Sequence, residues 1–312
     1  MKPDVLIAVG LMPQVMDTLA AEFATYRLWE AADQAALLAE IGPRVRAIAT
    51  NGVRGAEGKL IAALPKLEII ACYGVGVDAI DLTAARARGI IVTNTPDVLT
   101  DDVADMAVAL LLAASRRLSQ GDRHVRSGAW LKGDMMLTRK FTGSRVGILG
   151  LGRIGQAVAQ RCAAFGCTIA YHGPRQKPGV PYRYVASLPE LARDSDFLVV
   201  TCPGGAATRG LVDRAVLDAL GPEGILVNVS RGSVVDEPAL VAALVEKRLG
   251  GAGLDVFVNE PRAPEALFAM DNVVLQPHQG SATVETRGAM GDLVINNLRN
   301  HFAGRPAITP VK

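Results

Sequence analysis

The 312-residue chain has 33 Lys and Arg against 31 Asp and Glu, a net charge of +2, and half of its residues are apolar. This balance is typical of a globular protein with room for two domains. It gives no bias toward nucleic acid or a membrane surface, so we expect a small-molecule ligand. The longest apolar run, residues 106–114, is far shorter than the ~20 residues that span a membrane, and the chain opens without a signal-peptide pattern. We therefore expect a cytoplasmic protein.

The four cysteines give no sign of a metal or redox site. Cys72, Cys162, Cys167 and Cys202 have neither C-x-x-C spacing nor a neighbouring pair of histidines. We expect reduced, buried thiols and no metal site.

Residues 1–98 alternate short apolar runs, typical of buried parallel strands, with helical patterns. The predicted strands are residues 5–9, 47–50, 67–72 and 90–92, and the predicted helices are residues 15–23, 34–41, 58–64 and 82–88. A glycine-rich turn, residues 73–78, follows the third strand. This position is a carboxyl end, where ligands bind in such sheets, although a plain strand-to-helix turn would explain the glycines equally well.

A break near residue 95 separates this region from the next. Pro96 and the residue before it disfavour a helix, whereas Thr100, followed by two aspartates, is a typical helix start. The apolar helix that follows is predicted to reach about Leu118, with Arg116 and Arg117 near its negative pole. We interpret this break as the passage into a second domain.

Residues 119–143 are polar and have no clear periodicity, so we expect an arm or loop that lies over another surface. Trp130 and Met135 in this segment either mark a subunit contact or pack against the chain's own core.

A glycine motif begins the second domain. Residues 146–149 form a short apolar run, Gly150, Gly152 and Gly155 make G-x-G-x-x-G, and an alanine-rich helix follows at once. The first glycine allows a tight turn, the second lets backbone N–H groups approach a pyrophosphate, and the third lets helix and strand pack closely. The helix N-terminus adds partial positive charge. With both flanks correct, we favour a dinucleotide site over a glycine turn that merely joins strand and helix.

The same alternation continues to residue 275. The predicted strands are residues 146–149, 168–171, 197–201, 225–228, 251–255 and 273–275, which suit a complete dinucleotide-binding sheet. A long helix over residues 283–301 and the tail after it are expected to return to the first domain. We therefore predict two doubly wound parallel-sheet α/β domains with a cleft between them. Residues 1–98 and 284–312 are the flavodoxin-like substrate domain, and residues 99–283 are the Rossmann dinucleotide-binding domain.

The end of the second strand in this domain bears on the choice of cofactor. An NAD site carries an Asp or Glu about 20 residues after the glycine motif, and no acid stands there in this chain. His172, Arg175 and Lys177 occur instead, where a 2′-phosphate would lie. We predict NADP(H) as the preferred cofactor, with NAD(H) possible. The alternative interpretation is a solvated basic loop.

Three polar residues, Arg231, Glu260 and His278, follow the carboxyl ends of strands in the second domain. Taken one at a time, Arg231 could be a surface cation, Glu260 a solubilising acid and His278 a histidine of the core. Their joint placement on the ligand-binding edge of one sheet predicts a catalytic group.

With these segments in view, the chain resembles the D-isomer-specific 2-hydroxyacid dehydrogenases, especially the NADPH-dependent glyoxylate/hydroxypyruvate reductases and their hydroxyphenylpyruvate-reducing relatives. The resemblance covers nearly the whole length and rests on residues 73–78, 94–101, 150–155, 228–232, 255–261 and 277–278, in family order. It implies a catalytic triad of Arg231, Glu260 and His278 and a small 2-keto or 2-hydroxy acid as substrate. It also implies a homodimer built around the long helix and the arm after it.

The resemblance implies contacts to substrate and cofactor as well. Val75 and Gly76 would bind the substrate together with Arg231. The implied cofactor contacts are Thr100, Gly150, Gly152, Arg153, Ile154, Gly155, His172, Arg175, Lys177, Cys202, Pro203, Thr208, Val229, Ser230, Asp255, His278 and Gly280.

Two positions depart from the family pattern. Gln279 follows His278 where relatives often have Ile, which changes the contacts at the rim of the site. Pro174 stands where NADP-preferring relatives carry the phosphate-binding arginine, so Arg175 or Lys177 must take that role.

The residue types indicate a mechanism. Arg231 would clamp the substrate carboxylate, helped by backbone N–H groups of Val75 and Gly76, while hydride passes from NADPH to the keto carbon. His278 would protonate the forming alkoxide, and Glu260 is expected to raise the pKa of His278 and fix its orientation. Closure of the two lobes would exclude water. The expected function is NADPH-dependent reduction of glyoxylate or hydroxypyruvate to the D-2-hydroxy acid.

Two alternatives stay open. One is a reductase for bulkier aryl pyruvates, because the sequence does not fix the pocket volume and the arm near Trp130 and Met135 could come from a second subunit. The other is a non-catalytic, dinucleotide-sensing protein like the co-repressors of this family. Such a protein need not keep all three polar residues and would usually carry extra partner-binding segments.

Overall fold

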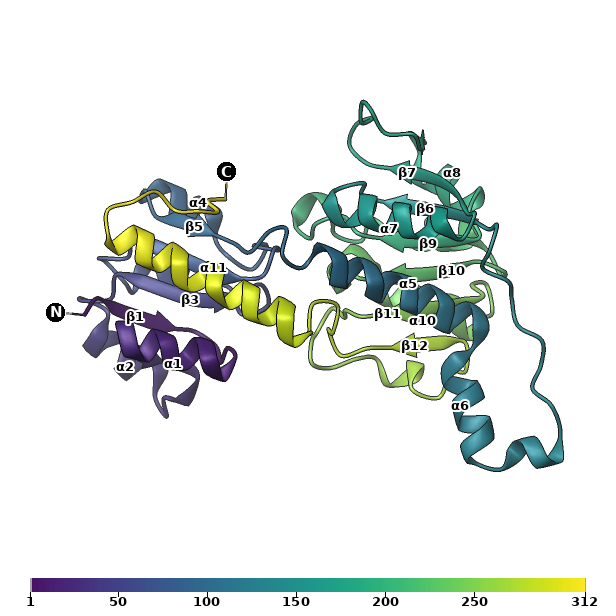
Figure 1. Ribbon diagram of the computed structural model, residues 1–312, viewed down its shortest axis with the longest axis horizontal. Coiled ribbons are helices and arrows are strands. Elements are labelled where there is room, and N and C mark those ends of the chain that lie inside the picture. The colour runs from purple at the N-terminus through teal and green to yellow at the C-terminus, as the bar shows by residue number, and fades with distance from the viewer. Residues whose placement is uncertain (1, 312) are drawn as a thin grey trace. The chain divides into compact units, whose positions relative to one another are not determined.

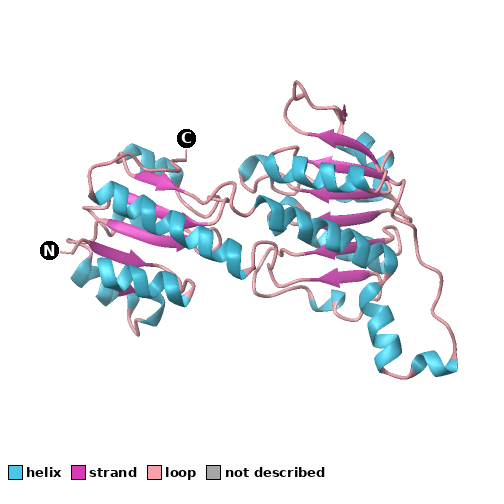
Figure 2. Cartoon of the chain, viewed as in Figure 1, coloured by secondary structure: helices cyan, strands magenta, loops and turns pink. Residues whose placement is uncertain are grey.

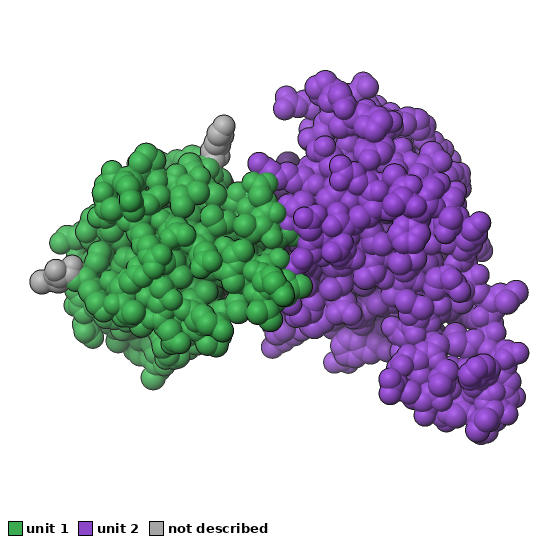
Figure 3. All heavy atoms as spheres, viewed as in Figure 1, with its two compact units in different colours: residues 1–99, 283–312 green, residues 100–282 purple. Residues whose placement is uncertain are grey.

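The computed structural model describes residues 2–311, so Met1 and Lys312, which fall in the predicted first domain, lie outside the description. The chain divides after Leu99 and again after Ala282 into two compact units (Figure 3). Unit 1 comprises residues up to 99 and from 283, and unit 2 comprises residues 100–282. The predicted boundaries each differ by one residue from this division. Both units are α/β structures with a parallel sheet, which confirms the predicted fold class (Figure 2).

Unit 1 contains a five-stranded sheet in the order β2-β1-β3-β4-β5, which is the flavodoxin-like order. Its strands are β1 Asp4–Ile7, β2 Ala24–Arg27, β3 Ala47–Asn51, β4 Ile69–Tyr73 and β5 Ile91–Thr93. Its helices are α1 Pro13–Glu22, α2 Gln34–Ile41, α3 Gly58–Ala62, α4 Leu82–Ala87 and α11 Val284–Phe302. Helix α11 packs on β4 and against α1, and it brings the C-terminal segment back to this sheet (Figure 1).

Unit 2 contains a seven-stranded sheet in the order β12-β11-β10-β9-β6-β7-β8. Its strands are β6 Arg145–Leu149, β7 Thr168–His172, β8 Arg183–Tyr184, β9 Phe197–Val200, β10 Ile225–Asn228, β11 Gly251–Leu254 and β12 Val273–Leu275. Its helices are α5 Thr100–Arg116, α6 Leu118–Arg126, α7 Arg153–Ala164, α8 Leu188–Arg193, α9 Arg214–Leu220 and α10 Glu237–Val245. From β6 the chain runs to β7 and β8 on one side and to β9–β12 on the other. The strand order therefore reverses at β6, as in a Rossmann sheet.

Short 3-10 helices connect several of these elements. They are η1 Leu28–Glu30, η2 Ala129–Lys132, η3 Ala206–Thr208, η4 Gly232–Val234 and η5 Glu265–Leu267.

Small side chains in β11 let a helix pack closely on the sheet of unit 2. Helix α5 lies over β10 and β11 and against α7 (Figure 1). A Cβ atom on Gly253 would lie only 3.0 Å from Cβ of Leu110 in α5. The Gly-Ala-Gly sequence of β11 therefore brings α5 close to the strand, at the cost of weak strand propensity.

Two edge strands were absent from the sequence prediction. β2 and β8 each end a sheet, and both are only partly buried. An edge strand of this kind shows no continuous apolar run, so neither pattern indicated a strand. All ten strands predicted from apolar runs are present.

The segment after α5 differs from the prediction. The helix expected to reach about Leu118 ends at Arg116, because Arg117 takes a left-handed conformation with φ 50°. Helix α6 covers residues 118–126, although residues 119–143 were expected to lack regular structure, and the ion pair between Arg126 and Asp122 at 2.8 Å supports it. The rest of the segment is an arm that projects from unit 2 and then returns to it (Figure 1), where Phe141 is buried against Phe197. Within residues 2–311, no helix is both long enough and apolar enough to cross a bilayer.

Candidate active site

The three glycines of the G-x-G-x-x-G motif have three different steric environments. Gly150 follows β6 with φ 96°, and a Cβ there would lie 2.6 Å from the backbone nitrogen of Cys202. A Cβ on Gly155 would lie 2.2 Å from the carbonyl oxygen of Gly150. At Gly152, no atom of the described chain, apart from those of Gly152 itself and its two neighbours in sequence, lies within 4 Å of the Cβ position. Gly150 and Gly155 thus permit the turn and the close packing, while Gly152 leaves space for a ligand to approach.

The N-terminus of α7 is suited to binding an anion. Gly152 is its N-cap, and within residues 2–311 no side chain caps this helix. By contrast, α8, α9 and α10 of the same unit are capped by the side chains of Ser187, Asp213 and Asp236. Uncapped N–H groups together with the helix dipole are what a pyrophosphate requires, so the residues at this turn fit a dinucleotide.

The basic loop after β7 is held in a defined shape. The hydroxyl of Tyr171 accepts the N–H of Lys177 at 2.7 Å, and the hydroxyl of Tyr184 donates to the carbonyl of Gly173 at 3.1 Å. His172 donates from Nδ1 to the carbonyl of Val185 at 2.9 Å, and Arg175 is exposed. Cations on a fixed loop at this strand end suit a 2′-phosphate.

The other predicted cofactor residues of unit 2 lie at the same edge of the sheet or at the start of α5. Thr100 begins α5, while Cys202, Pro203 and Thr208 follow β9, Val229 and Ser230 follow β10, and Gly280 follows β12. The hydroxyl of Thr208 donates to the carbonyl of Pro203 at 2.7 Å, which closes the loop after β9. Burial raises the pKa of the Cys202 thiol to about 11, so this residue is not a nucleophile.

His278 and Glu260 form a direct pair. Nδ1 of His278 lies 2.7 Å from Oε2 of Glu260, and the other carboxylate oxygen accepts the backbone N–H of Phe257 at 3.1 Å. Burial alone would raise the pKa of Glu260. The hydrogen bond from His278, the Phe257 N–H and the positive charge of Arg231 outweigh burial, so the pKa of Glu260 is lowered. An ionised Glu260 therefore holds the His278 ring in one orientation.

Arg231 lies near enough to this pair to act on the charge of Glu260, and the backbone of its turn packs closely on the neighbouring loop. A Cβ on Gly232 would lie 2.0 Å from the carbonyl carbon of Phe257, so only glycine lets the two segments approach in this way. The Arg231 guanidinium donates to the carbonyl of Ser230 at 2.8 Å. Because β10, β11 and β12 are neighbours in the sheet, the segments after them bring Arg231, Glu260 and His278 to one edge.

Two buried side chains hold the backbone next to the three predicted catalytic residues, and the sequence patterns indicated neither role. Asn228 donates from Nδ2 to the carbonyl of Arg231 at 2.9 Å and accepts the N–H of Ser230 at 3.0 Å. Asp255, predicted as a cofactor contact, is 1% exposed, and its carboxylate accepts the N–H groups of Gln279 and Gly280 at 2.6 and 2.8 Å. Burial raises the pKa of Asp255, and these two N–H groups oppose that shift.

Val75 and Gly76, the predicted substrate contacts, lie in unit 1 just beyond the carboxyl end of β4. They belong to a loop whose preceding residue, Gly74, has φ 150°.

The family model for the NAD-binding domain of D-isomer-specific 2-hydroxyacid dehydrogenases matches residues 108–280. The chain belongs to this family. It is 52% identical to hydroxyphenylpyruvate reductase of Plectranthus scutellarioides and 50% identical to glyoxylate/hydroxypyruvate reductase A of Arabidopsis thaliana, each over 98% of both chains. It also resembles the solved NADPH-dependent glyoxylate/hydroxypyruvate reductase of Sinorhizobium meliloti in complex with NADP and malonate. That match has a TM-score of 0.94 and 47% identity, and it covers 100% of this chain and 97% of that one.

Family membership confirms the predicted resemblance and the predicted enzyme class. This 2-hydroxyacid dehydrogenase is an oxidoreductase that uses a nicotinamide dinucleotide, as the sequence also predicted. The glycine turn and the uncapped α7 of unit 2 fit such a dinucleotide.

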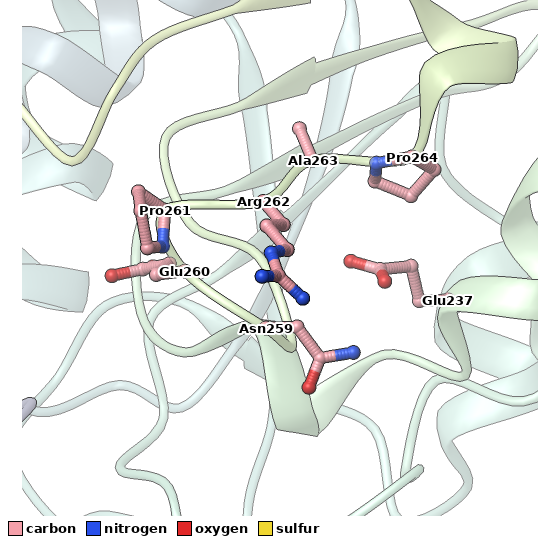
Figure 4. Close-up of a pocket in the computed structure, with 7 residues that line it drawn as sticks. All are labelled: Glu237, Asn259, Glu260, Pro261, Arg262, Ala263 and Pro264. Atoms are coloured by element: carbon pink, nitrogen blue, oxygen red, sulfur yellow. The ribbon is translucent and has the colours of Figure 1, made fainter.

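A cavity of about 670 Å³ lies beside Glu260 (Figure 4). It is lined by Glu237, Asn259, Glu260, Pro261, Arg262, Ala263 and Pro264. In Figure 4 the carboxylate of Glu260 points away from the guanidinium of Arg262, whereas Glu237 points toward it. Neither Arg231 nor His278 lines the cavity, so it is not the space in which the triad would meet a substrate.

Proposed function

We propose that this protein reduces a small 2-keto acid, glyoxylate or hydroxypyruvate, to the D-2-hydroxy acid with NADPH. The observation that carries the proposal is the 2.7 Å contact between His278 and Glu260, with Arg231 at the neighbouring strand end. A proton donor, its orienting carboxylate and a cation for a substrate carboxylate are the groups that this reduction needs. The names of the Arabidopsis and Sinorhizobium relatives support the same reaction.

Each residue of the triad has a separate task. When bound, NADPH supplies the hydride that forms the new C–H bond at the keto carbon. Arg231 binds the substrate carboxylate, and the N–H groups of Val75 and Gly76 share in that binding. With Nδ1 of His278 engaged by Glu260, Nε2 gives its proton to the carbonyl oxygen as the π bond breaks. Glu260 balances the positive charge of the imidazolium before transfer, and solvent then reprotonates the neutral ring.

The preference for NADPH is supported by the loop after β7. His172, Arg175 and Lys177 stand where an NAD site would carry an acid. Pro174 replaces the arginine of NADP-preferring relatives, so we propose that Arg175 or Lys177 pairs with the 2′-phosphate.

A second candidate reaction is the reduction of a bulkier aryl pyruvate. The observation in its favour is the 52% identity to a hydroxyphenylpyruvate reductase over 98% of both chains.

Initial rates test the two candidates together. NADPH and NADH oxidation would be measured with glyoxylate, hydroxypyruvate and 4-hydroxyphenylpyruvate. We expect NADPH-dependent turnover of the two small acids, with a raised KM in Arg231→Lys, which keeps the charge but loses bidentate binding. A clear preference for the aryl acid would replace the first candidate by the second. If neither NADPH nor NADH were oxidised with any of the three keto acids, the non-catalytic, dinucleotide-sensing alternative would be favoured.

We also propose that the protein is a cytoplasmic homodimer held together through the arm. The arm carries apolar side chains that no part of the described chain covers, with Leu131 93% exposed and Leu137 96% exposed. The four cysteines are buried and form no disulfide within the described residues, which suits a reducing compartment. Light scattering should give twice the chain mass for the natural protein and the single chain mass for Leu131→Glu/Leu137→Glu. A monomeric natural protein would contradict the dimer.

A further inference from the structure

Three successive backbone carbonyl groups in the loop after β4 accept hydrogen bonds from other residues of the protein. The carbonyl of Gly74 accepts the backbone N–H of Thr95 at 2.9 Å, and the carbonyl of Val75 accepts Nδ2 of Asn94 at 2.9 Å. The carbonyl of Gly76 accepts the thiol of Cys72 at 3.7 Å. All three donors belong to unit 1, so the loop's orientation is set within that unit.

The N–H groups of this loop are in the opposite situation. Within residues 2–311, the N–H groups of Val75 and Gly76 make no hydrogen bond. In a trans peptide the N–H points away from the carbonyl of the same unit. The bond from Asn94 to the Val75 carbonyl therefore fixes the direction of the Gly76 N–H. Adjacent N–H groups turned outward in this way form the kind of concavity that binds an anion.

We propose that Asn94 is a positioning residue for the substrate carboxylate. It holds the Val75–Gly76 peptide so that the Gly76 N–H is available to the substrate, and it polarises that peptide, which strengthens the N–H as a donor. The role rests on the proposed function, in which these N–H groups share in binding a 2-keto acid. Asn94 itself touches neither substrate nor cofactor in this role.

The C-terminal segment in turn holds Asn94. The hydroxyl of Thr309 donates to the carbonyl of Asn94 at 2.6 Å, and the N–H of Asn94 donates to the carbonyl of Thr309 at 3.3 Å. Asn297, fully buried in α11, donates to the Thr309 hydroxyl at 2.9 Å and accepts the Ile308 N–H at 2.8 Å. The tail after α11 therefore fixes the backbone from which the Asn94 side chain reaches the loop.

The test is Asn94→Ala, assayed at saturating NADPH. Loss of one bond that orients a donor to a charged group should raise KM for glyoxylate about tenfold. Carboxylate binding is shared by ground state and transition state, so kcat should fall less than KM rises. Fluorescence titration should give an unchanged Kd for NADPH, since the dinucleotide site lies in unit 2.

A matched control removes a bond of the same type elsewhere in unit 1. Asn300 donates from Nδ2 to the carbonyl of Pro306 at 3.2 Å, near the tail but not at the loop. Asn300→Ala should leave KM within about twofold, as expected for a substitution away from such a feature. If Asn94→Ala does not fold, Thr309→Val takes its place and should raise KM by about threefold, the lower end for one hydrogen bond.

The positioning role would be overturned if a folded Asn94→Ala kept the KM of the natural protein, or if Asn300→Ala raised KM to the same extent. It would equally be overturned if Thr309→Val, used as the substitute, left KM unchanged. Failure of the proposed function looks different, because the unmodified protein would then not oxidise NADPH with any of the three keto acids. That result would remove both proposals, whereas an active protein with an unchanged KM removes only this one.

Discussion

Each unit has a glycine-rich turn directly after a strand of its parallel sheet. In unit 1, β4 leads into Gly74 and Gly76, and in unit 2, β6 leads into the motif that begins at Gly150. The helices that follow differ. Helix α7 begins at Arg153, inside the motif, and has no side-chain cap within the described chain. Helix α4 begins only at Leu82, and the side chain of Asp81 caps it by accepting the N–H of Ala84 at 2.9 Å.

This difference is the one we expect between a pyrophosphate site and a plain glycine turn. A pyrophosphate needs the N–H groups and the positive end of a helix, and these are available only where no side chain already satisfies them. In unit 1, Asp81 occupies that position, so the loop has only its own N–H groups to offer. Such a loop suits a single carboxylate better than a dinucleotide.

The largest effect should come from removing the proposed proton donor, His278, at the edge of unit 2. His278→Ala should reduce turnover about 10²- to 10⁴-fold, the range for a general acid, while the Kd for NADPH stays near normal. Steady-state rates and fluorescence titration measure the two quantities. His301→Ala is the matched control, because His301 also contacts a carboxylate, Glu68 at 2.8 Å, but in unit 1. Loss of cofactor affinity with turnover retained would contradict the role of His278.

Two alanine substitutions separate the roles of the motif glycines. Gly155→Ala places a Cβ 2.2 Å from the Gly150 carbonyl, so α7 must shift from β6. Overpacking of this kind costs about 1–3 kcal/mol of unfolding free energy, and NADPH affinity should fall with it. The Cβ added by Gly152→Ala would contact no atom of residues 2–311 beyond its neighbours in sequence. The melting temperature should therefore stay the same while the affinity for NADPH falls. Normal affinity in a stable Gly152→Ala would mean that the pyrophosphate does not approach this glycine.

Acid should affect the two units unequally. In unit 2, hydrogen bonding from Arg145 lowers the pKa of Asp196 despite partial burial, and Arg139 adds a further bond at 2.7 Å. A carboxylate whose pKa is lower in the folded protein than in the unfolded chain stabilises the fold at pH values above its ordinary pKa of about 3.9. That stabilisation is lost as the pH falls through the pKa of the folded state. Asp196→Asn should cost about 1.5–3 kcal/mol at neutral pH, and urea titrations should show the difference closing in acid.

The matched carboxylate in unit 1 is Glu68, whose pKa Arg46 lowers through a hydrogen bond. Its side chain is 38% exposed, so solvent screens the pair and Glu68→Gln should cost only about 0–1 kcal/mol. If Asp196→Asn and Glu68→Gln lowered the free energy of unfolding equally, the expected difference between the two units would be contradicted.

The sequence predicted those parts of the fold and of the candidate site that leave a pattern of residues along the chain. Buried parallel strands and the glycine motif were predicted because both are continuous runs. Helix α6 was not predicted, because Leu118 and Val125 are the only large apolar residues in its sequence and are too few to show a helical period. The triad's members were predicted from their shared sheet edge, but the buried bonds from Asn228 and Asp255 to nearby backbone were not. Contacts between side chain and backbone follow turn geometry, which residue spacing alone does not specify.

The smallest effect tests the capped helix itself. Asp81→Ala removes the cap of α4 and should cost about 1 kcal/mol of unfolding free energy, as for other N-cap aspartates. NADPH affinity should not change, and the uncapped α4 should not acquire affinity for pyrophosphate, because its first turn begins six residues after Gly76 rather than inside the glycine turn. Urea denaturation and isothermal titration with pyrophosphate measure the two outcomes. Pyrophosphate binding gained by Asp81→Ala in unit 1 would show that the cap alone, and not the start of the helix within the turn, separates the two sites.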